Sequence, residues 1–387
     1  MKYKRIFLIV LDGVGVGDAP DCLSFNDQNN NTLKHIDDNF PLFIPNLKKI
    51  GFMNTTNLTE LKDVEAYYTI AKPKNPGKDS LNGHYEMVGV KSDTSFAIFN
   101  DGFPREILQS IVNVSGRKIL GNKPSINGNI LEELGAVAKN YGALIIFTTG
   151  GSDLHIAAHE DIVPIASLYT YCEKLRDLSD KFNWKIARII ARPFTGKEKY
   201  RFISSARKDY SKEPPSPGVL EAIRNKGYDV IGIGKVNDIF VGSNRINKNI
   251  KASDNNESIN KLLNIMEKEW SGLCFVNLPD FDNYGHLKDT ENFAKAIEEF
   301  DVNIPIIQNK LELDDLLIIT ADHGNDPTAV TNAHTRENLP VIIYGRNLRE
   351  PKLLDAFNSL SVIGATIADN FEVNDNSFGE SILDKLI

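Results

Sequence analysis

Residues 6–11 read Ile-Phe-Leu-Ile-Val-Leu, and Asp12 and Gly13 follow them directly. A continuous apolar run of this length, rich in branched side chains, predicts a strand that is buried on both faces of a parallel sheet. In sheets of this kind, ligands bind outside the carboxyl ends of the strands. Asp12 is therefore the first residue of the chain that we expect near a functional site.

Later apolar runs have the same character, and they are Leu144–Phe147, Ile186–Ile190, Val230–Ile233, Leu273–Asn277, Leu316–Thr320 and Val341–Tyr344. Stretches with helical patterning lie between several of them, among them Ile259–Trp270 and Glu291–Gln308. Pro305 predicts a kink or a break in the second of these helices. The alternation predicts an α/β fold with a mostly parallel sheet and helices on both faces.

Composition narrows the class of protein. The 387 residues are 41% hydrophobic and 25% charged, which is typical of globular chains and predicts about two domains. The net charge of -8 makes nucleic acid an unexpected partner. Three scattered cysteines do not form a disulfide framework, and the apolar run near the start is too short for a signal peptide or a membrane span. We expect a soluble, cytoplasmic protein that is a monomer or weak oligomer.

The middle of the chain differs in charge from the rest. Lys181–Lys212 holds ten Lys and Arg but only two acidic residues. The Pro-rich stretch Glu213–Gly218 follows it and is typical of a linker, and Gly and Pro also cluster at Asn100–Pro104. We predict a core domain made of residues 1–99 and 215–387, with a smaller α/β domain of residues 100–214 inserted in it.

Carboxylates and imidazoles follow several of the predicted strands. Together these ligand types suit Mn, Zn or Fe, and six of them are too many for one ion with an open position. Two neighbouring ions can instead hold both oxygens of an in-line phosphoryl displacement. The alternative is that each is an ordinary capping or hydrogen-bonded polar residue. The six residues are Asp12, Asp282, His286, Asp322, His323 and His334.

A nucleophile is the remaining requirement of such a site. The polar segment Lys78–Glu86 follows a Pro-Gly turn and contains Ser80. A metal can activate a serine hydroxyl, and a phosphate on Ser80 would meet free N–H groups if the residue begins a helix. The alternative is an ordinary serine at a helix start.

These motifs together resemble the phosphopentomutase family of the alkaline phosphatase superfamily, and the resemblance covers nearly the whole chain. The residues that carry it are Val10–Gly17, Gly77–Gly89, Gly121–Pro124, Ile156–Glu160, Ile189–Gly196, Gly234–Phe240, Asp280–His286 and Thr320–Gly345. The Asp-His-Gly-Asn-Asp stretch at residues 322–326 with a later histidine is shared across the superfamily. The segments 77–89 and 156–160 are specific to the phosphopentomutase branch.

The resemblance implies an alkaline-phosphatase-like core with two Mn²⁺ ions and an inserted cap domain. It implies an isomerase that moves phosphate between C5 and C1 of ribose or deoxyribose through a bisphosphate, primed by a sugar bisphosphate such as glucose 1,6-bisphosphate. Ser80 matches the phosphorylated threonine of the family, and the related cofactor-independent phosphoglycerate mutases use serine. One metal would be held by Asp12, Asp322, His323 and Ser80, and the other by Asp282, His286 and His334.

The resemblance also bears on the sugar phosphate. Arg192, Arg207 and Lys235 are expected to bind its non-reacting phosphate. The sugar-contacting aspartate of the family falls on Gly151, and Asp153, two positions on, is the candidate to replace it.

The motif at Asp280–His286 is one residue shorter than the family pattern, so Asp280 is a second candidate for the position of Asp282. Three alternatives stay open at this point. They are a mutase for a different sugar phosphate, a metal-dependent phosphatase or phosphodiesterase, and a metal-binding protein without activity.

Overall fold

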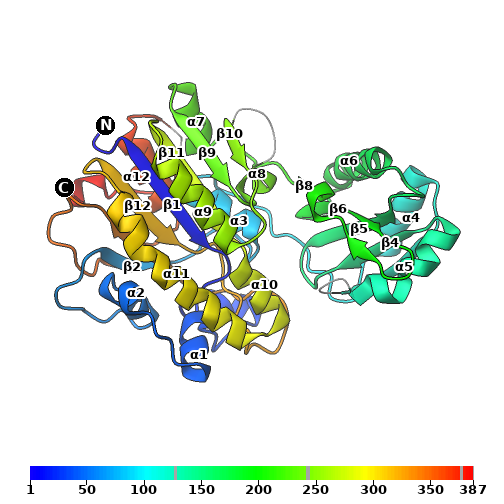
Figure 1. Cartoon of the computed structure of the whole chain (residues 1–387), viewed down its shortest axis with the longest axis horizontal. Coiled ribbons are helices and arrows are strands. Elements are labelled where there is room, and N and C mark those ends of the chain that lie inside the picture. The colour runs from blue at the N-terminus through cyan, green and yellow to red at the C-terminus, as the bar shows by residue number, and fades with distance from the viewer. Residues whose placement is uncertain (126–128, 241–244, 375–377, 387) are drawn as a thin grey trace. The chain divides into compact units, whose positions relative to one another are not determined.

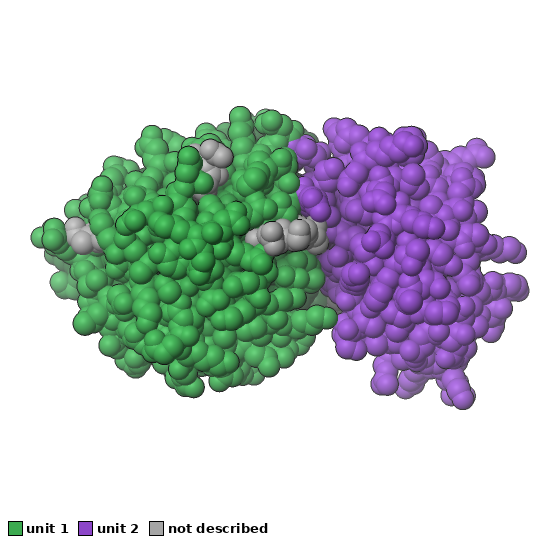
Figure 2. All heavy atoms as spheres, turned by 90° about the horizontal axis from the view of Figure 1, so that it is seen from above, with its two compact units in different colours: residues 1–93, 214–387 green, residues 94–213 purple. Residues whose placement is uncertain are grey.

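A computed structural model describes residues 1–125, 129–240, 245–374 and 378–386. The chain divides into two compact units, which Figure 2 shows in different colours. Unit 1 consists of residues 1–93 and 214–387, and unit 2 is the continuous segment 94–213. The composition of the chain had placed the divisions at 99/100 and 214/215. Phe99 explains the earlier start of unit 2, because it packs in the apolar core of that unit with Phe103 and its backbone N–H donates to Gly151 O.

Unit 1 contains one sheet, in which the described residues form seven strands in the order β10-β9-β11-β1-β12-β13-β2. The strands are β1 (Arg5–Leu11), β2 (Tyr67–Ala71), β9 (Asp229–Ile233), β10 (Lys248–Ile250), β11 (Gly272–Leu278), β12 (Asp315–Thr320) and β13 (Leu339–Tyr344). The neighbours from β10 to β12 pair in parallel, and β13 is antiparallel to both β12 and β2. The prediction of an α/β fold with a mostly parallel sheet is therefore confirmed.

The first strand lies inside this sheet, between two strands from the far end of the chain. Figure 1 shows β1 in blue between yellow-green β11 and orange β12. All seven residues of β1 are buried, as an apolar run without alternation predicts. In register, Leu11 lies opposite Leu278 and Val10 opposite Thr320, so the carboxyl ends of the three strands lie at one edge of the sheet.

Helices form two groups around the sheet of unit 1. In one group, α7 contacts β9 and α12 contacts both α7 and α3; in the other, α9 contacts β11 and α11 contacts α1, α2, α9 and α10. The helices are α1 (Thr32–Asn39), α2 (Pro45–Lys49), α3 (Ser80–Met87), α7 (Val219–Asn225), α8 (Val236–Ile239), α9 (Asn255–Met266), α10 (Asp280–Leu287), α11 (Thr290–Lys310) and α12 (Val362–Asn370). Short 3₁₀ turns cover Cys22–Phe25, Met53–Thr56 and Leu383–Lys385.

A kink or a break was predicted at Pro305, and of these the break does not occur: α11 runs unbroken from Thr290 to Lys310. A proline in a helix leaves the carbonyl four residues earlier without its usual N–H donor. Here that carbonyl belongs to Asp301, and Asn46 Nδ2 lies 3.3 Å from it as a substitute donor. The helix expected at Ile259–Trp270 is α9, which begins four residues earlier because Asp254 caps its first turn.

Unit 2 has its own mixed sheet, with the order β3-β4-β5-β6-β7 and with β8 paired to β6. Its strands are β3 (Ile119–Pro124), β4 (Leu144–Thr148), β5 (Asp153–His159), β6 (Arg188–Thr195), β7 (Arg201–Phe202) and β8 (Lys208–Ser211). Its helices are α4 (Arg105–Ser115), α5 (Asn129–Tyr141) and α6 (Ile165–Phe182), with a 3₁₀ turn at Ser204–Ala206. Residues of α4 and α6 pack on one face of the sheet and residues of α5 on the other. Among the described residues, no helix in either unit combines the length and apolarity that crossing a bilayer requires.

Candidate metal and phosphoryl-transfer site

The polar residues predicted at strand ends lie at one edge of the unit 1 sheet. Asp12 follows β1, Lys235 follows β9 after Gly234, Asp280 follows β11 after Pro279, and Asp322 follows β12. These four strands are neighbours in the sheet, so their carboxyl ends bring residues from distant parts of the chain together.

The first cluster consists of Asp12, Asp322 and His323. All three side chains are buried, and their candidate ligand atoms lie within 4.8 Å of one another. His323 Nε2 lies 3.4 Å from Asp12 Oδ1 and 3.4 Å from Asp322 Oδ2. Neither of these carboxylate oxygens accepts a hydrogen bond from the described residues.

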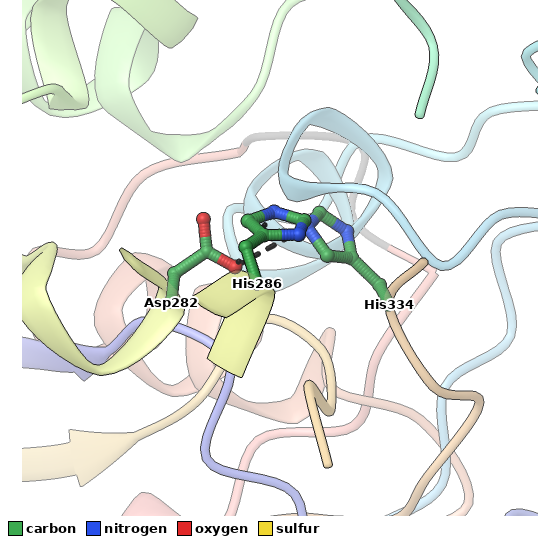
Figure 3. A group of neighbouring side chains, drawn as sticks. All are labelled: Asp282, His286 and His334. Atoms are coloured by element: carbon green, nitrogen blue, oxygen red, sulfur yellow. Dashed lines mark hydrogen bonds and ion pairs between the residues drawn. The ribbon is translucent and has the colours of Figure 1, made fainter. Parts of the chain in front are cut away.

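The second cluster consists of Asp282, His286 and His334, which converge in Figure 3. Asp282 and His286 are four residues apart in α10, so they lie on the same side of that helix. His334 comes from the loop before β13. Asp282 Oδ1 lies 3.2 Å from His334 Nε2 and 3.5 Å from His286 Nε2, and the two Nε2 atoms are 3.1 Å apart.

Hydrogen bonds to backbone carbonyls determine which nitrogen of each imidazole can bind a metal. The Nδ1 atoms of His286, His323 and His334 lie 2.9 Å from Asn332 O, 3.1 Å from Gly324 O and 2.8 Å from Lys78 O. A carbonyl can only accept, so each Nδ1 must carry a proton, and in a neutral ring Nε2 then presents the lone pair that a metal can bind. In both clusters, lone pairs of nitrogen and carboxylate oxygen therefore point at one another. A cation at the centre relieves this repulsion, so both residue sets fit a divalent metal.

The electrostatics of the first cluster lead to the same conclusion. Burial and the charge of Asp322 raise the pKa of Asp12 to about 7, although the ammonium group of Lys235 opposes the shift. In the second cluster, burial lowers the pKa of His286 and keeps its ring neutral, which is the form that binds metals. The two clusters adjoin, because the rings of His323 and His334 stack with their centroids 3.7 Å apart.

Ser80 lies beside the first cluster as the first residue of α3. Its Oγ is 3.2 Å from His323 Nε2 and 3.2 Å from Lys235 Nζ, and the residue is 2% exposed. The helix begins here because the Asp79 carboxylate accepts the backbone N–H of Asn82, as an N-cap does. The hydroxyl thus lies at a helix N-terminus, where free N–H groups favour a phosphate.

A glycine allows α3 to approach the metal-ligand loop closely. A Cβ on Gly83 would lie 2.0 Å from the backbone oxygen of Asp322, so a larger residue would push the helix and the loop apart. The segment Ser80–Gly83 therefore contains both the candidate nucleophile and the glycine that allows α3 to lie close to the first cluster.

Lys235 lies closer to the nucleophile than the sequence predicted. The sequence predicted that it binds the non-reacting phosphate together with Arg192 and Arg207. In the structure, its ammonium group pairs with Asp12 Oδ2 and lies 3.2 Å from Ser80 Oγ. Lys235 belongs to unit 1, whereas both arginines belong to unit 2. Its ammonium group therefore lies between the first cluster and the Ser80 hydroxyl.

Two further residues, which the sequence did not single out, contact the candidate site. Nδ1 of His84, which is fully buried, lies 2.9 Å from Ser80 O and 3.2 Å from Asp322 Oδ2. Asn325 Nδ2 donates to Asp282 Oδ1 at 2.8 Å and to Asp282 O at 3.1 Å. His84 lies in the motif Gly77–Gly89 and Asn325 in the motif Thr320–Gly345. Their closeness in sequence to Ser80 and His323 was the signal that could have identified them. Asp280, the alternative to Asp282, instead exchanges hydrogen bonds with Asn255 at the start of α9.

Arg336 joins the loop of His334 to the segment that leads to Ser80. The side chain is 2% exposed, and its guanidinium donates to the carbonyls of residues 73, 75 and 77 and to both oxygens of Asp21. This role cannot be predicted from the local sequence, because it depends on contacts across about 260 residues.

The remaining predicted residues lie in unit 2. Both carboxylate oxygens of Asp153 pair with Arg188, at 3.1 and 2.5 Å, so this side chain does not extend into solvent. Arg207 forms a bidentate pair with Asp209, with both distances 2.8 Å. Arg192 stacks over the ring of Phe202 at 4.2 Å. At Gly151, an added Cβ would meet no heavy atom within 4 Å.

Comparisons with known proteins bear on the fold and on the family of the chain. The PH0037 protein from Pyrococcus horikoshii shares the fold over 96% of this chain and 98% of its own, with 14% identity and a TM-score of 0.50. A phosphoglycerate mutase from Leishmania mexicana aligns over 98% and 97% with 11% identity, but its TM-score is 0.48. A family model described as the metalloenzyme superfamily matches residues 4–375. Since that match spans nearly the whole chain and both metal-ligand clusters, the chain belongs to the metalloenzyme superfamily.

Proposed function

We propose that the chain is a phosphopentomutase that interconverts the 1-phosphate and 5-phosphate of ribose or deoxyribose through a phosphorylated Ser80. One observation carries the proposal. The Ser80 hydroxyl lies at a helix N-terminus within 3.2 Å of both His323 Nε2 and Lys235 Nζ, beside two adjoining clusters that fit metals. A buried hydroxyl in this setting is suited to accept and donate a phosphoryl group.

The residue sets would hold two divalent ions, for which we propose Mn²⁺. Asp12, Asp322, His323 and Ser80 would hold one, and Asp282, His286 and His334 the other. Imidazole and carboxylate ligands together suit this ion. Bound there, the ions would neutralise charge on the transferring group and lower the pKa of the serine hydroxyl.

The residues of the chain then act on the phosphoryl group in a balanced exchange. The bond between Ser80 Oγ and phosphorus breaks, a hydroxyl of the sugar monophosphate forms the new bond, and the hydroxyl proton passes to Ser80 Oγ. The product is a sugar bisphosphate, whose other phosphate returns to Ser80 by the reverse exchange. Lys235 donates toward Oγ throughout, and the N–H groups at the start of α3 stabilise the charge of the phosphoryl oxygens.

Arg192 supports a sugar monophosphate as the substrate. No described residue offers it a carboxylate partner, so its charge is available to the non-reacting phosphate. Arg207 could contribute only in part, because Asp209 already holds its guanidinium. A sugar bisphosphate such as glucose 1,6-bisphosphate would supply the first phosphoryl group to Ser80.

The test is a panel of sugar 1-phosphates and 5- or 6-phosphates, assayed with Mn²⁺ and a trace of bisphosphate. We expect isomerised pentose phosphate without stoichiometric release of inorganic phosphate. Ser80→Ala should abolish turnover, whereas Ser258→Ala, which removes another buried hydroxyl of unit 1, should not. Free phosphate as the main product would identify a phosphatase instead, and isomerisation of other sugars alone would reassign the substrate. Near-normal turnover of Ser80→Ala would show that another residue carries the phosphoryl group.

A further inference from the structure

One face of the unit 2 sheet combines a polar half and an apolar half. Ala157 and Phe194 pack against α5 in the apolar half. In the other half, the register of β5 and β6 places Asp153 opposite Arg188 and His155 opposite Ile190. Leu154 and the residues that alternate with it point to the opposite face, where they pack in the core with α4 and α6.

His155 is buried in this polar half without hydrogen-bond partners. The residue is 5% exposed, and its ring stacks on Phe147 with the centroids 4.6 Å apart and the planes 24° apart. Neither Nδ1 nor Nε2 has a hydrogen-bond partner in the described part of the chain. Buried polar groups in folded proteins are normally paired, so an imidazole with two unpaired nitrogens destabilises the unit unless something else binds it.

The two carboxylates near His155 cannot serve as its partners, because arginines already hold them. Asp153 pairs with Arg188, and Asp209 pairs with Arg207 and lies 3.5 Å from Arg188 Nη1. Burial and the neighbouring guanidinium groups lower the pKa of His155 well below its ordinary value, so the ring is neutral. A neutral imidazole offers one N–H donor and one acceptor.

A positive charge is present in the same group of side chains. Arg192 lies over Phe202, whose ring stacks with that of Phe147 at 6.1 Å, and Phe147 in turn stacks on His155. Burial lowers the pKa of Arg192 to about 10, so it remains charged at neutral pH. The group thus presents a cation beside an uncharged donor and acceptor.

We propose that His155 is a specificity-determining residue, which hydrogen-bonds a hydroxyl of the sugar phosphate whose anionic group Arg192 attracts. The inference rests on the proposed function, and it names a residue that recognises the sugar of the proposed substrate. Sugar hydroxyls both donate and accept, so one hydroxyl can pair with the donor nitrogen of a neutral imidazole and a second with its acceptor nitrogen, whereas a bare phosphate ion does not require the acceptor nitrogen.

His159 provides a matched control on the same strand. It lies on the same face, but its Nε2 donates to Gly196 O at 2.8 Å and its Nδ1 accepts the backbone N–H of Asp161 at 3.2 Å. Phenylalanine keeps an aromatic ring, slightly larger than imidazole, and removes both nitrogens. We expect His155→Phe to keep or raise the melting temperature of the full-length protein and His159→Phe to lower it. An equal loss of stability in both variants would overturn the proposal, because His155 would then have partners within the protein.

Binding is measured by calorimetry with ribose 5-phosphate, D-ribose and inorganic phosphate as separate probes. His155→Phe should weaken ribose 5-phosphate binding by about tenfold or more, with inorganic phosphate unaffected. His155→Gln, which keeps a donor and an acceptor, should recover part of the loss. Unchanged ribose 5-phosphate affinity in His155→Phe, or no binding by the wild type, would overturn the inference. If the protein binds ribose 5-phosphate through His155 but has no mutase activity, the inference about His155 stands and only the proposed reaction is refuted.

Discussion

Replacing Arg336 by methionine should destabilise unit 1 and disturb the segment that carries Ser80. Methionine keeps much of the side-chain volume but removes every donor. The carbonyls of Pro73 and Asn75, both 3.0 Å from the guanidinium, and of Gly77 would then lose this partner. Asp21 is half-exposed and can be rehydrated, so most of the loss comes from the carbonyls.

The expected loss can be estimated from these contacts. A buried acceptor left without its donor costs about 1–3 kcal/mol, and removing one partner of a buried charged network costs about 3–5 kcal/mol. Because water can reach part of the segment after the substitution, we expect about 3–5 kcal/mol in total. At about 2–4 °C per kcal/mol for domains of this size, the melting temperature of unit 1 should fall by about 6–20 °C.

The two tryptophans of the chain allow this measurement, because Trp270 lies in unit 1 and Trp184 in unit 2. In a Trp184→Phe background, urea unfolding followed by Trp270 fluorescence reports unit 1 alone. Arg346→Met is the control, because Arg346 is exposed and donates to the carbonyl of residue 309. Arg336→Lys should fall between wild type and Arg336→Met, since one ammonium cannot reproduce the planar fork. If Arg336→Met unfolds at the same urea concentration as the control, the reasoning about these carbonyls is refuted.

Further predictions concern the contact of Gly83 with the loop of Asp322, the ion pair of Asp209 with arginines in unit 2, and the metals. Gly83→Ala should reduce turnover strongly while both units stay folded by circular dichroism, because the added Cβ would meet the backbone of Asp322; wild-type activity would contradict this. Burial alone would raise the pKa of Asp209, but Arg207 and Arg188 hold it below the ordinary value of 3.8. Its contribution to stability is therefore complete above that ordinary value and is lost as the pH falls toward the lower folded pKa. Unit 2 should accordingly lose stability as the pH falls below about 5 toward the folded pKa, and Asp209→Asn should flatten this dependence in Trp184 fluorescence. Chelation should abolish activity and lower the melting temperature, and Mn²⁺ should restore both; a melting temperature that does not respond to either would argue against the two metal sites.

Much of the fold and of the candidate site was predictable, because both depend on local sequence patterns that have one structural meaning in a parallel sheet. An apolar run without alternation, such as Ile6–Leu11, requires burial on both faces and hence a position inside a sheet. The carboxyl ends of parallel neighbours then share one edge, so Asp12 and Asp322 were expected together without knowledge of the strand order. Their position in one cluster agrees with that expectation.

Features that depend on contacts between distant segments were not predictable in this way. Nothing near Arg336 indicates that its guanidinium meets three carbonyls of residues 73–77. The unbroken helix at Pro305 depends on Asn46, which supplies the substitute donor from another part of the chain. Lys235 was predicted to bind the non-reacting phosphate together with Arg192 and Arg207, and the contacts of its ammonium group with Asp12 and Ser80 were not expected. Its sequence position after a buried strand was a signal that could have placed it beside Ser80.

The central position of β1 determines the order in which the nascent chain can fold. Arg5 pairs opposite Gly272, so 267 residues must be synthesised after it before that partner exists. At about 5–20 residues per second, this takes roughly 13–50 s. Residues 94–213 form their whole sheet from one continuous segment, so they can fold on the ribosome within that interval. Meanwhile the first strand, apolar on both faces, stays without its partners and exposed to other nascent chains. The strand order thus makes this segment an aggregation hazard for as long as Gly272 has not been synthesised.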